Sequence, residues 1–329
     1  METIKWGIIG AGDVCERKSG PAFYKTEHSA LVAVMRRDET KARDYALRHG
    51  VASYYTDAGE LLRDPEVGAV YIATPPDTHK DYTLLALEAG KPVYVEKPMA
   101  LNYEECRQMI VASESAGQKL FVAYYRRALP YFIKLKELLE AGAIGRALTV
   151  DVRFSRPPLP SDLIPEQHTW RVKRAIAGEG YFFDLAPHTL DILDFLLGEV
   201  EEAKGFAQNL GGLYEVKDTV SAVLQFRSGV VGTGLWCFVA PASSVEDHIR
   251  ISGTKGELCF NTFAFQPIRL TTAEGLETFR PEHPEHIQQP LIRSIVGELL
   301  GTDLCPSTAR SASRCSQVMD WIMAPSGHS

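Results

Sequence analysis

The 329 residues are too many for one ordinary hydrophobic core and suit two domains. A composition of 45% hydrophobic and 23% charged residues is typical of a folded globular protein and excludes a disordered chain. The formal net charge of −7 gives no reason to expect nucleic acid or an anionic membrane as a partner.

The first part of the chain alternates short apolar runs with helical patterns. Strands are predicted at residues 4–9, 31–35, 67–73, 92–95 and 120–123, and helices at 12–24, 38–49, 78–89 and 102–116. Strands that are apolar on both faces and alternate with helices indicate a parallel sheet covered on both sides. Residues 1–123 are therefore predicted to form an α/β domain of the dinucleotide-binding Rossmann type.

From residue 124 the pattern changes to long alternating strands. A helix is predicted at 131–141, an extended segment at 147–154, a proline-rich loop at 157–160, a helix at 183–197, strands at 200–208, 219–226, 230–239, 248–252 and 257–260, and helices at 287–300 and 308–323. Residues 124–329 are therefore predicted to form an α+β domain with a large, mostly antiparallel open sheet that serves substrate binding and oligomerisation. Its C-terminal helices are candidates to pack back on the first domain.

The N-terminus has no basic segment followed by an apolar one, so no signal peptide is predicted. No apolar run approaches the roughly 20 residues of a membrane span. The six cysteines form no C-x-x-C pair and no cluster with histidine at zinc-finger spacing. We therefore expect a cytoplasmic protein with reduced thiols, no metal site and no membrane partner.

A glycine-rich turn, Gly10-Ala11-Gly12, follows the first predicted strand. In the fingerprint G-x-G-x-x-G/A the first glycine permits a tight turn, and the second lets a pyrophosphate approach the backbone. Cys15 takes the third position, where a small residue suffices. The N-terminus of the following helix would present free N–H groups to the phosphates. An ordinary glycine turn is the alternative, and the strand–turn–helix context favours the nucleotide site.

The end of the second predicted strand distinguishes the two nicotinamide cofactors. An acidic residue there would bind the ribose 2′-OH of NAD and repel the 2′-phosphate of NADP. The chain instead has Arg36 and Arg37, followed by Lys41, and such cations suit a 2′-phosphate. Asp38 comes after both arginines and is expected to cap the next helix. We predict NADP in preference to NAD, with a solvated cluster of surface charges as the alternative.

The apolar strand at 92–95 ends in the triplet Glu96-Lys97-Pro98. Ligands bind beyond the carboxyl ends of parallel strands, so Lys97 is expected to face the cofactor crevice. Proline at this point can fix an unusual peptide geometry, including a cis bond, that directs the lysine. A surface salt bridge beside a turn is the alternative.

Asp184, His188 and Asp191 fall at i, i+4 and i+7 and would share one face of a helix. This helix is apolar nearly all round, which predicts that it is buried. Buried ionisable residues are costly unless they are paired or functional. Pro187 is expected in the first helical turn, which would place Asp184 and His188 near the start of the helix. A core histidine and a helix cap are the alternatives.

These segments together resemble the Gfo/Idh/MocA family, the relatives of glucose–fructose oxidoreductase and myo-inositol dehydrogenase. The resemblance is carried by GIIGAGDV at residues 7–14, ATPPDTH at 73–79, VEKPMA at 95–100, WR at 170–171 and GEGYFFDLAPHTLD at 178–191. It implies an NAD(P)-dependent dehydrogenase or reductase that acts on CH–OH groups. In the family a lysine and a histidine flank the carbon that exchanges hydride, and an aspartate orients substrate hydroxyls. These roles would fall on Lys97, His188 and Asp184.

The resemblance also implies a set of cofactor contacts. Together with the contacts argued above from the motifs, the predicted cofactor contacts are Gly10, Ala11, Gly12, Asp13, Val14, Arg36, Arg37, Lys41, Thr74, Pro75, His79, Glu96, Lys97, Arg127, Trp170 and Arg171. The chain departs from the family at Ala186, where glycine is usual, and at Glu179, which interrupts a glycine run. Residues 124–126 replace a segment that contains asparagine or histidine in several sugar-specific members, so the substrate stays open.

The family implies a polyhydroxy small molecule as substrate, such as a sugar, keto-sugar or cyclitol. Tyr125, His168 and Tyr181, together with Asp184 and His188, are the candidate substrate contacts, and core tyrosines are the alternative. Either Lys97 or His188 could exchange the hydroxyl proton.

Two alternative functions remain. One is a trans-dihydrodiol dehydrogenase of the same family. The other is a non-catalytic NAD(P)-binding regulator, a class that typically lacks the lysine or the histidine. Because open apolar sheet faces usually pair, a homodimer or homotetramer through the second sheet is expected.

Overall fold

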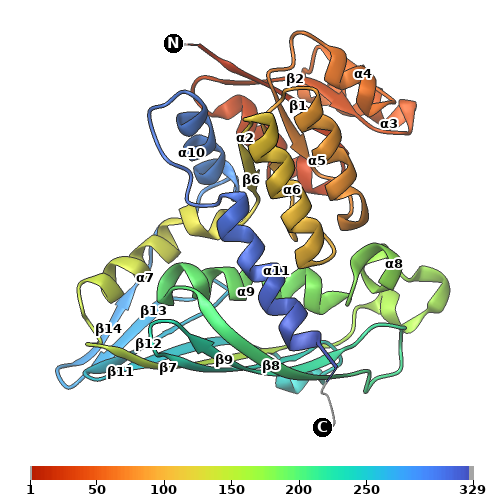
Figure 1. Ribbon diagram of the computed structural model, residues 1–329. Coiled ribbons are helices and arrows are strands. Elements are labelled where there is room, and N and C mark those ends of the chain that lie inside the picture. Colours follow the sequence, from red (N-terminus) through yellow and green to blue (C-terminus); the bar gives the residue numbers. More distant parts are fainter. Residues whose placement is uncertain (1, 326–329) are drawn as a thin grey trace. The chain divides into compact units, whose positions relative to one another are not determined.

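The computed structural model describes residues 2–325. The chain divides into two compact units. The first contains the residues up to Leu129 and, in addition, His283–Ser313. The second contains Pro130–Glu282 and the residues from Arg314 onward (Figure 1). Each unit is described by itself below.

The first unit contains a parallel six-stranded sheet in the order β3-β2-β1-β4-β5-β6. The strands are β1 (Ile4–Ile9), β2 (Ser29–Met35), β3 (Ser53–Tyr55), β4 (Ala69–Ile72), β5 (Val93–Val95) and β6 (Leu120–Val122). This is the strand order of a Rossmann fold, so the predicted fold class is confirmed. β3 was not predicted, because its three residues lie at the edge of the sheet and none of them is fully buried.

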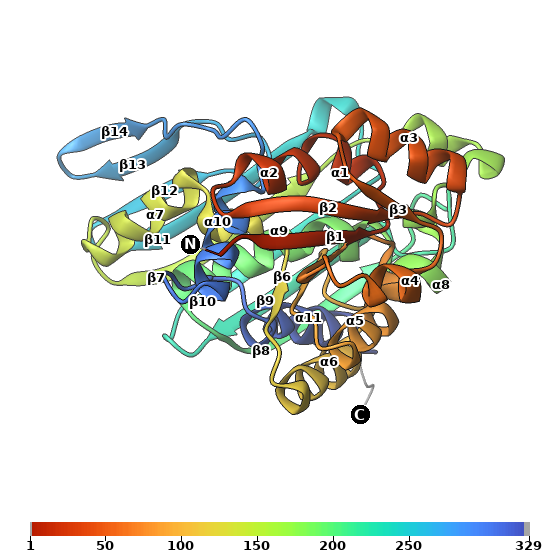
Figure 2. The same ribbon diagram turned by 90° about the horizontal axis from the view of Figure 1, so that it is seen from above.

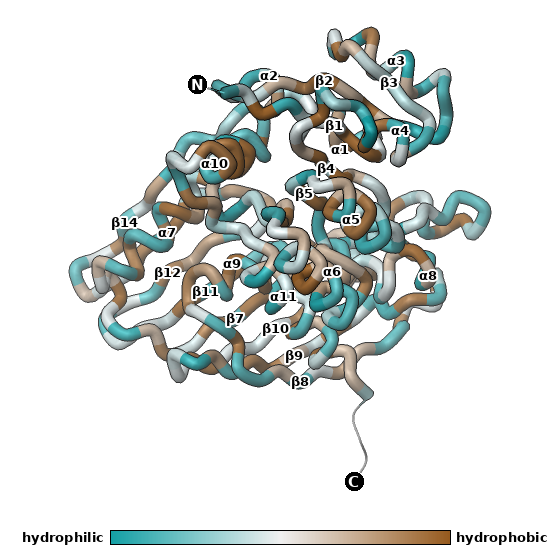
Figure 3. The backbone as a smooth tube through the Cα atoms, turned by 45° about the horizontal axis from the view of Figure 1, so that its top comes forward, coloured by the Kyte–Doolittle hydropathy of each residue, from teal (hydrophilic) through white to brown (hydrophobic). Residues whose placement is uncertain are grey.

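Helices connect these strands, and a helix from the C-terminal part of the chain joins them. They are α1 (Asp13–Arg17), α2 (Gly20–Lys25), α3 (Glu39–His49), α4 (Ala58–Arg63), α5 (His79–Glu88), α6 (Tyr103–Ala116) and α10 (Gln289–Leu299). The single helix predicted at 12–24 was wrong: it is two helices, since Pro21 lies in the first turn of α2 and Gly20 abuts the carbonyl oxygen of Cys15. α10 is hydrophobic along much of its length (Figure 3), and Leu291, Ile292 and Ile295 are fully buried.

The second unit contains an eight-stranded sheet in the order β14-β13-β12-β11-β7-β10-β9-β8. The strands are β7 (Ala147–Ser155), β8 (Val200–Gln208), β9 (Thr219–Phe226), β10 (Val231–Cys237), β11 (Glu246–Gly253), β12 (Gly256–Phe260), β13 (Ile268–Thr272) and β14 (Gly275–Phe279). β7 and β10 pair in parallel and the other neighbours are antiparallel, which confirms the mostly antiparallel prediction. The β13–β14 hairpin at one end of the sheet (Figure 2) was missed, because β14 has almost no buried residue.

Helices α7 (Pro130–Glu140) and α9 (Tyr181–Leu197) lie on one face of this sheet (Figure 1). The short α8 (Arg174–Ala177) precedes α9. α11 (Ala309–Met323) is divided between the units, and its residues from Arg314 onward belong to the second unit. Arg314 donates to both carboxylate oxygens of Asp194 in α9, at 2.7 and 2.6 Å. Along β9, Ala222 and Leu224 are buried toward these helices, whereas Val223 is exposed, so the other face of the sheet is open.

Within residues 2–325, no helix has the length and apolar character needed to cross a bilayer.

Candidate functional site

The glycine turn at the end of β1 has the geometry that the fingerprint requires. Gly10 has φ +88°, and a Cβ there would lie 2.5 Å from the Thr74 side chain and 2.9 Å from its backbone nitrogen. A Cβ on Gly12 would meet nothing closer than 3.7 Å, so the approach to its backbone is open. Gly12 caps α1 without a side-chain hydrogen bond. The backbone of this turn is therefore accessible beside the N-terminus of α1, where the first amides of a helix have no carbonyl partner within the helix.

Cys15 fills the third position of the fingerprint from inside the fold. It is fully buried, and its carbonyl oxygen accepts a hydrogen bond of 2.9 Å from the Tyr45 hydroxyl. Burial raises the pKa of the Cys15 thiol to about 12. The residue is therefore an inert packing element under α1.

At the tip of β2, the cap and the two arginines have different surroundings. The Asp38 carboxylate accepts from the Lys41 backbone N–H at 3.1 Å, which confirms its predicted role as the cap of α3. The Lys41 ammonium lies 3.5 Å from the same carboxylate, so its charge is already paired. Arg37 is exposed and Arg36 half-buried, and within residues 2–325 neither guanidinium has an ion-pair partner. These two cations are therefore the groups at this strand end that can meet an anion.

The residues after β4 form a tight turn that His79 holds in place. The Thr78 hydroxyl lies 2.8 Å from the Thr74 hydroxyl and 2.9 Å from the Pro75 carbonyl oxygen, within hydrogen-bonding distance of both. His79 is fully buried, with Nε2 2.8 Å from the Thr74 carbonyl oxygen and Nδ1 2.9 Å from that of Pro98. Burial lowers the pKa of His79, and the two carbonyl oxygens and Glu96 oppose that shift. His79 therefore joins the end of β4 to the end of β5, and its predicted cofactor contact stays a prediction.

Glu96-Lys97-Pro98 directly follows β5 at the carboxyl edge of the sheet. Glu96 is buried, Lys97 is half-buried, and the Lys97–Pro98 peptide bond is cis. Glu96 accepts hydrogen bonds from Tyr71 Oη, Gln288 Nε2 and the backbone N–H of Lys97. The Glu96 carboxylate is thus held inside the first unit, and the catalytic role of Lys97 stays a prediction.

The segment after β6 is more buried than the sequence suggested. Tyr125 and Arg127 are each about one-twentieth exposed, at 6% and 5%. Arg127 donates to the Pro306 carbonyl oxygen at 3.4 Å, and the Arg126 guanidinium lies 5.0 Å from the centre of the Tyr125 ring. Arg127 thereby links the segment after β6 to the C-terminal segment of the same unit. The predicted cofactor contact of Arg127 and the predicted substrate contact of Tyr125 stay predictions.

In the second unit, α9 places Asp184 and His188 as the helical spacing predicted. His188 and Asp191 are buried, at 5% and 1%, and Asp184 is partly exposed. The His188 ring meets the Phe263 ring edge-on at 5.6 Å. One expectation was wrong: α9 starts at Tyr181, so Pro187 lies inside the helix and not in its first turn.

Predicted residues from the preceding loop gather around the start of α9. Arg171 donates from Nε to the Asp184 carboxylate at 3.1 Å, and its guanidinium lies 4.6 Å from the Trp170 ring centre. The Tyr181 hydroxyl is buried and donates to Asp162 at 2.6 Å, and His168 Nε2 lies 3.2 Å from the Asp162 carbonyl oxygen. Arg171 and Asp184 thus form a charged pair, while the substrate contacts of Tyr181 and His168 stay predictions.

Sequence reasoning missed the residues that surround Glu96. Tyr71 and Tyr94 are register partners on β4 and β5, and their rings stack at 4.9 Å between centres. Each tyrosine is the middle residue of a short apolar segment, VYI or VYV, that ends at the carboxyl edge of the sheet. This shared pattern is a weak sequence signal of the pair. Gln288 has no local signal, because it lies 192 positions from Glu96.

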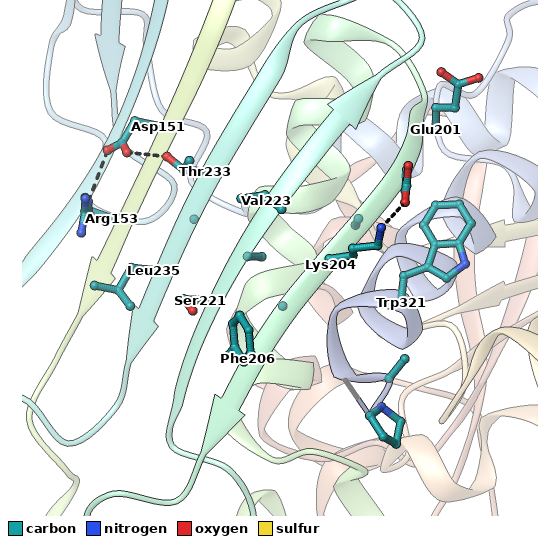
Figure 4. Close-up of a pocket in the computed structure, with 17 residues that line it drawn as sticks. Asp151, Arg153, Glu201, Lys204, Phe206, Ser221, Val223, Thr233, Leu235 and Trp321 are labelled. Carbon is teal, nitrogen blue, oxygen red and sulfur yellow. Dashed lines mark hydrogen bonds and ion pairs between the residues drawn. The ribbon is translucent and has the colours of Figure 1, made fainter. Parts of the chain in front are cut away.

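The open face of the second sheet carries a trough of about 1130 Å³ (Figure 4). Residues of β7, β8, β9 and β10 line it, and Trp321 bounds it beside β8. Asp151 accepts from Thr233 at 2.8 Å and pairs with Arg153 at 3.4 Å. Phe206 and Val223 present apolar surface, 70% and 53% exposed. This trough lies on the face of the sheet that the helices leave open.

Two family profiles match consecutive parts of the chain. One, described as an oxidoreductase family with an NAD-binding Rossmann fold, matches residues 4–124. The other, described as the GFO/IDH/MocA C-terminal domain, matches residues 132–259.

Several curated proteins are similar over most of their length. Oxidoreductase P35 of Formosa agariphila is 40% identical over 96% of this chain and 97% of its own length. The 1,5-anhydro-D-fructose reductase of Ensifer adhaerens is 30% identical over 90% of this chain and 88% of its own. The trans-1,2-dihydrobenzene-1,2-diol dehydrogenase of Mus musculus is 34% identical over 77% and 73%.

Solved structures share the fold. The aldose-aldose oxidoreductase of Caulobacter crescentus, complexed with glycerol, superposes with a TM-score of 0.86 at 25% identity, covering 97% of this chain and 96% of that one. A levoglucosan dehydrogenase in complex with NADH and levoglucosan superposes with a TM-score of 0.85 at 22% identity, covering 98% and 96%.

Proposed function

Since the chain belongs to the Gfo/Idh/MocA family of NAD-binding oxidoreductases, we propose that it transfers a hydride between a nicotinamide cofactor and a CH–OH or carbonyl carbon of a sugar, keto-sugar or cyclitol. One observation carries the proposal: the chain keeps Lys97, Asp184 and His188 together with an open glycine turn after β1.

The cofactor fits the residues of the first unit. The accessible backbone at Gly12 and the first amides of α1 would hold the pyrophosphate, as the open space at Gly12 supports. Arg36 and Arg37 would hold a 2′-phosphate, so NADP is the proposed preference. When bound, the nicotinamide would supply the hydride donor or acceptor.

Three ionisable side chains would bind the substrate and move its proton. Lys97 would hold the substrate oxygen and stabilise the negative charge that develops on it. His188 on α9 would take or give a proton, and its edge contact with Phe263 would help to orient the ring. Asp184, fixed by its ion pair with Arg171, would accept hydrogen bonds from substrate hydroxyls. Lys97 is the alternative proton donor.

The substrate class rests on the relatives and is open to a direct screen. The similar protein of Ensifer adhaerens is a 1,5-anhydro-D-fructose reductase, which supports a keto-sugar substrate here. The screen follows NADPH absorbance with 1,5-anhydro-D-fructose, other keto-sugars and aldoses, and follows NADP⁺ reduction with cyclitols and sugars. Turnover of one of these groups is the expected result, and nucleotide binding without turnover of any of them would contradict the proposal.

A trans-dihydrodiol dehydrogenase is the second candidate. The Mus musculus relative has this activity by name, and the aromatic Phe263 beside His188 would offer apolar contact to a cyclic diene. Oxidation of trans-1,2-dihydrobenzene-1,2-diol with NADP⁺, at a higher kcat/KM than any sugar, would favour this candidate.

For assembly and location we propose a cytoplasmic homodimer or homotetramer that pairs through the open sheet face. The trough has exposed apolar side chains, and its charges Asp151–Arg153 and Glu202–Lys204 are already paired within the face. A surface of this kind suits a second copy of itself around a two-fold axis. None of the six cysteines forms a disulfide bond within residues 2–325, which supports a reducing compartment.

A further inference from the structure

The carboxylate of Glu96 is buried directly before Lys97, with 7% of the residue exposed. A buried carboxylate is expensive unless hydrogen bonds replace its water. Three donors do so here. Tyr71 Oη and Gln288 Nε2 each lie 2.6 Å from Oε1, and the Lys97 backbone nitrogen lies 3.0 Å from Oε2.

The two short hydrogen bonds act on one oxygen, and the backbone bond acts on the other. Tyr71 and Gln288 therefore determine how the carboxylate is rotated, and that rotation determines whether Oε2 faces the Lys97 N–H. Hydrogen bonds from neutral donors to a carboxylate are shorter and stronger than those between neutral groups. Tyr71 and Gln288 are thus linked to the Lys97 backbone through the Glu96 carboxylate.

The orientation of the Gln288 amide follows from its partners. A carboxylate only accepts, so the amide NH₂ must face Glu96. The amide oxygen then accepts from the Tyr94 hydroxyl at 2.8 Å. Gln288 is 1% exposed, and both ends of its side chain are thereby satisfied inside the fold.

Gln288 comes from the segment that returns to the first unit late in the chain, immediately before α10. Its backbone N–H donates to the Lys18 carbonyl oxygen at 3.3 Å, close to the end of α1. The side chain thus reaches the end of β5 from an anchored backbone. Such a residue has little freedom to follow Glu96 if the carboxylate moves.

We propose that Gln288 is a positioning residue for Lys97: through Glu96, together with Tyr71, it holds the backbone of Lys97 in place for hydride transfer. This inference rests on the proposed function for its role in turnover. The structural part, that Gln288 sets the Glu96–Lys97 geometry, holds independently of the substrate.

The first test replaces Gln288 by methionine, which has a similar length and no amide. Gln288→Met should lower kcat by about 10- to 100-fold, since a misplacement of about 1 Å can reduce turnover by that order. The Kd for NADPH, measured by nucleotide fluorescence, should change less than threefold, because the glycine turn and the arginines are untouched.

The matched control is Gln289→Met, the same chemical change at the next residue, where the amide donates to the Lys25 carbonyl oxygen on the surface. It should keep wild-type kcat. If Gln288→Met turns over within twofold of wild type, or loses NADPH binding in proportion to kcat, the positioning role is wrong.

The second test, Gln288→Glu, separates positioning from packing through pH. Two carboxylates that face each other share a proton, and the pKa of the pair is raised. At low pH the shared proton replaces the amide N–H as donor to Glu96, so activity should approach that of wild type. As pH rises the proton leaves, the like charges repel, and kcat should fall at least tenfold between about pH 6 and 9 relative to wild type. A pH profile parallel to that of wild type would contradict the proposal.

Other titratable groups near Glu96 do not account for such a fall in kcat between pH 6 and 9. Burial raises the pKa of Cys15 to about 12, raises those of Tyr71 and Tyr94 well above their usual values, and lowers that of His79. The new descending limb would therefore arise at position 288. The titratable groups that interact with Glu96 include Cys15, Tyr71, His79 and Tyr94. His286, two residues from Gln288, contacts Lys25 and the Arg17 carbonyl oxygen in wild type and in the variant alike.

Crystal structures of wild type and Gln288→Met provide a readout without turnover. The Glu96 carboxylate should rotate and lose its hydrogen bond to the Lys97 N–H in the variant. An unmoved Glu96–Lys97 pair in Gln288→Met would overturn the inference even if the kcat of the variant falls. If wild type turns over none of the screened substrates, the proposed function fails while the structural comparison still decides the role of Gln288.

Discussion

Individual side chains at the strand ends of the first unit define what it can bind. Lys97 follows a buried carboxylate, and Arg36 and Arg37 follow β2 without ion-pair partners in the described part of the chain. Asp38, by contrast, is used by the helix that it caps. The charge left over for a ligand at the β2 end is therefore positive.

Removal of the proposed acid–base groups should affect turnover more than folding. Lys97→Ala and His188→Ala should each lower kcat by on the order of 10²–10⁴-fold, the scale of losing a general acid or base. Steady-state kinetics with NADPH and the identified substrate checks this. Lys119→Ala, a surface lysine paired with Glu298, is the control and should retain full activity. Near-normal kcat in both site variants would refute the assignment.

Arg36 and Arg37 should affect the KM for NADPH and leave the KM for NADH nearly unchanged. Arg36→Ala/Arg37→Ala should raise KM for NADPH by at least about 100-fold, since the variant loses two charge-assisted bonds to a phosphate that contribute roughly 1.5–3 kcal/mol each. KM for NADH should stay within threefold. Arg43→Ala, exposed on α3, removes the same charge elsewhere and should leave both values unchanged. A preference of wild type for NADH would reject NADP as the cofactor.

At the scale of elements, the alternation of strands and helices was predictable because apolar runs and glycine turns are local features. The failures occurred where packing decides. The break between α1 and α2 depends on Gly20, where a Cβ would lie 2.1 Å from the Cys15 carbonyl oxygen. β3 and β14 are held by pairing at sheet edges and carry few buried side chains. The role of Gln288 can be recognised only from the structure, because the fold brings its segment from far along the chain to the end of β5.

The α1–α2 break gives a stability prediction. Gly20→Ala should destabilise the fold by about 1–3 kcal/mol, the usual range for overpacking, because the new methyl group would overlap Cys15 O and Tyr45 Oη. Gly68→Ala is the control, since its Cβ would meet nothing closer than 3.5 Å. Its change in unfolding free energy should stay within about 0.5 kcal/mol. Urea unfolding measures both, and equal effects would contradict the close approach at Gly20.

At the scale of the whole molecule, the sequence indicated two domains and an open second sheet, and the structure has that sheet with an apolar trough on its uncovered face. The C-terminal helices were named as candidates to pack back on the first domain, but no local pattern marks where the returning segment begins and ends, because the contacts of residues 283–313 with the rest of the first unit are long-range. Two thiols, Cys237 on β10 and Cys259 on β12, are half-buried on the second sheet and can report on what covers it.

The assembly proposal can be tested with one substitution on the open face. Phe206→Asp should at least halve the mass found by light scattering at micromolar concentration, because a charge would be buried between copies. Cys237 should then react faster with a maleimide at pH 8. Cys15 is the internal standard: with its pKa raised to about 12, only about one part in 10⁴ is thiolate.

Leu47→Asp, at an 82% exposed position on α3, is the matched control and should leave the mass unchanged. A monomeric wild type would exclude pairing through the sheet.

The late return of residues 283–313 to the first unit has a consequence for biosynthesis. A ribosome releases the six parallel strands long before Gln288, α10 and the Phe121–Thr308 bridge that complete their surroundings. During that interval Glu96 lacks one of its donors, and the apolar side of α10 is missing from the unit. The strands at the N-terminus are therefore made first and finished last, and nascent chains have a window in which chaperones can bind the incomplete unit.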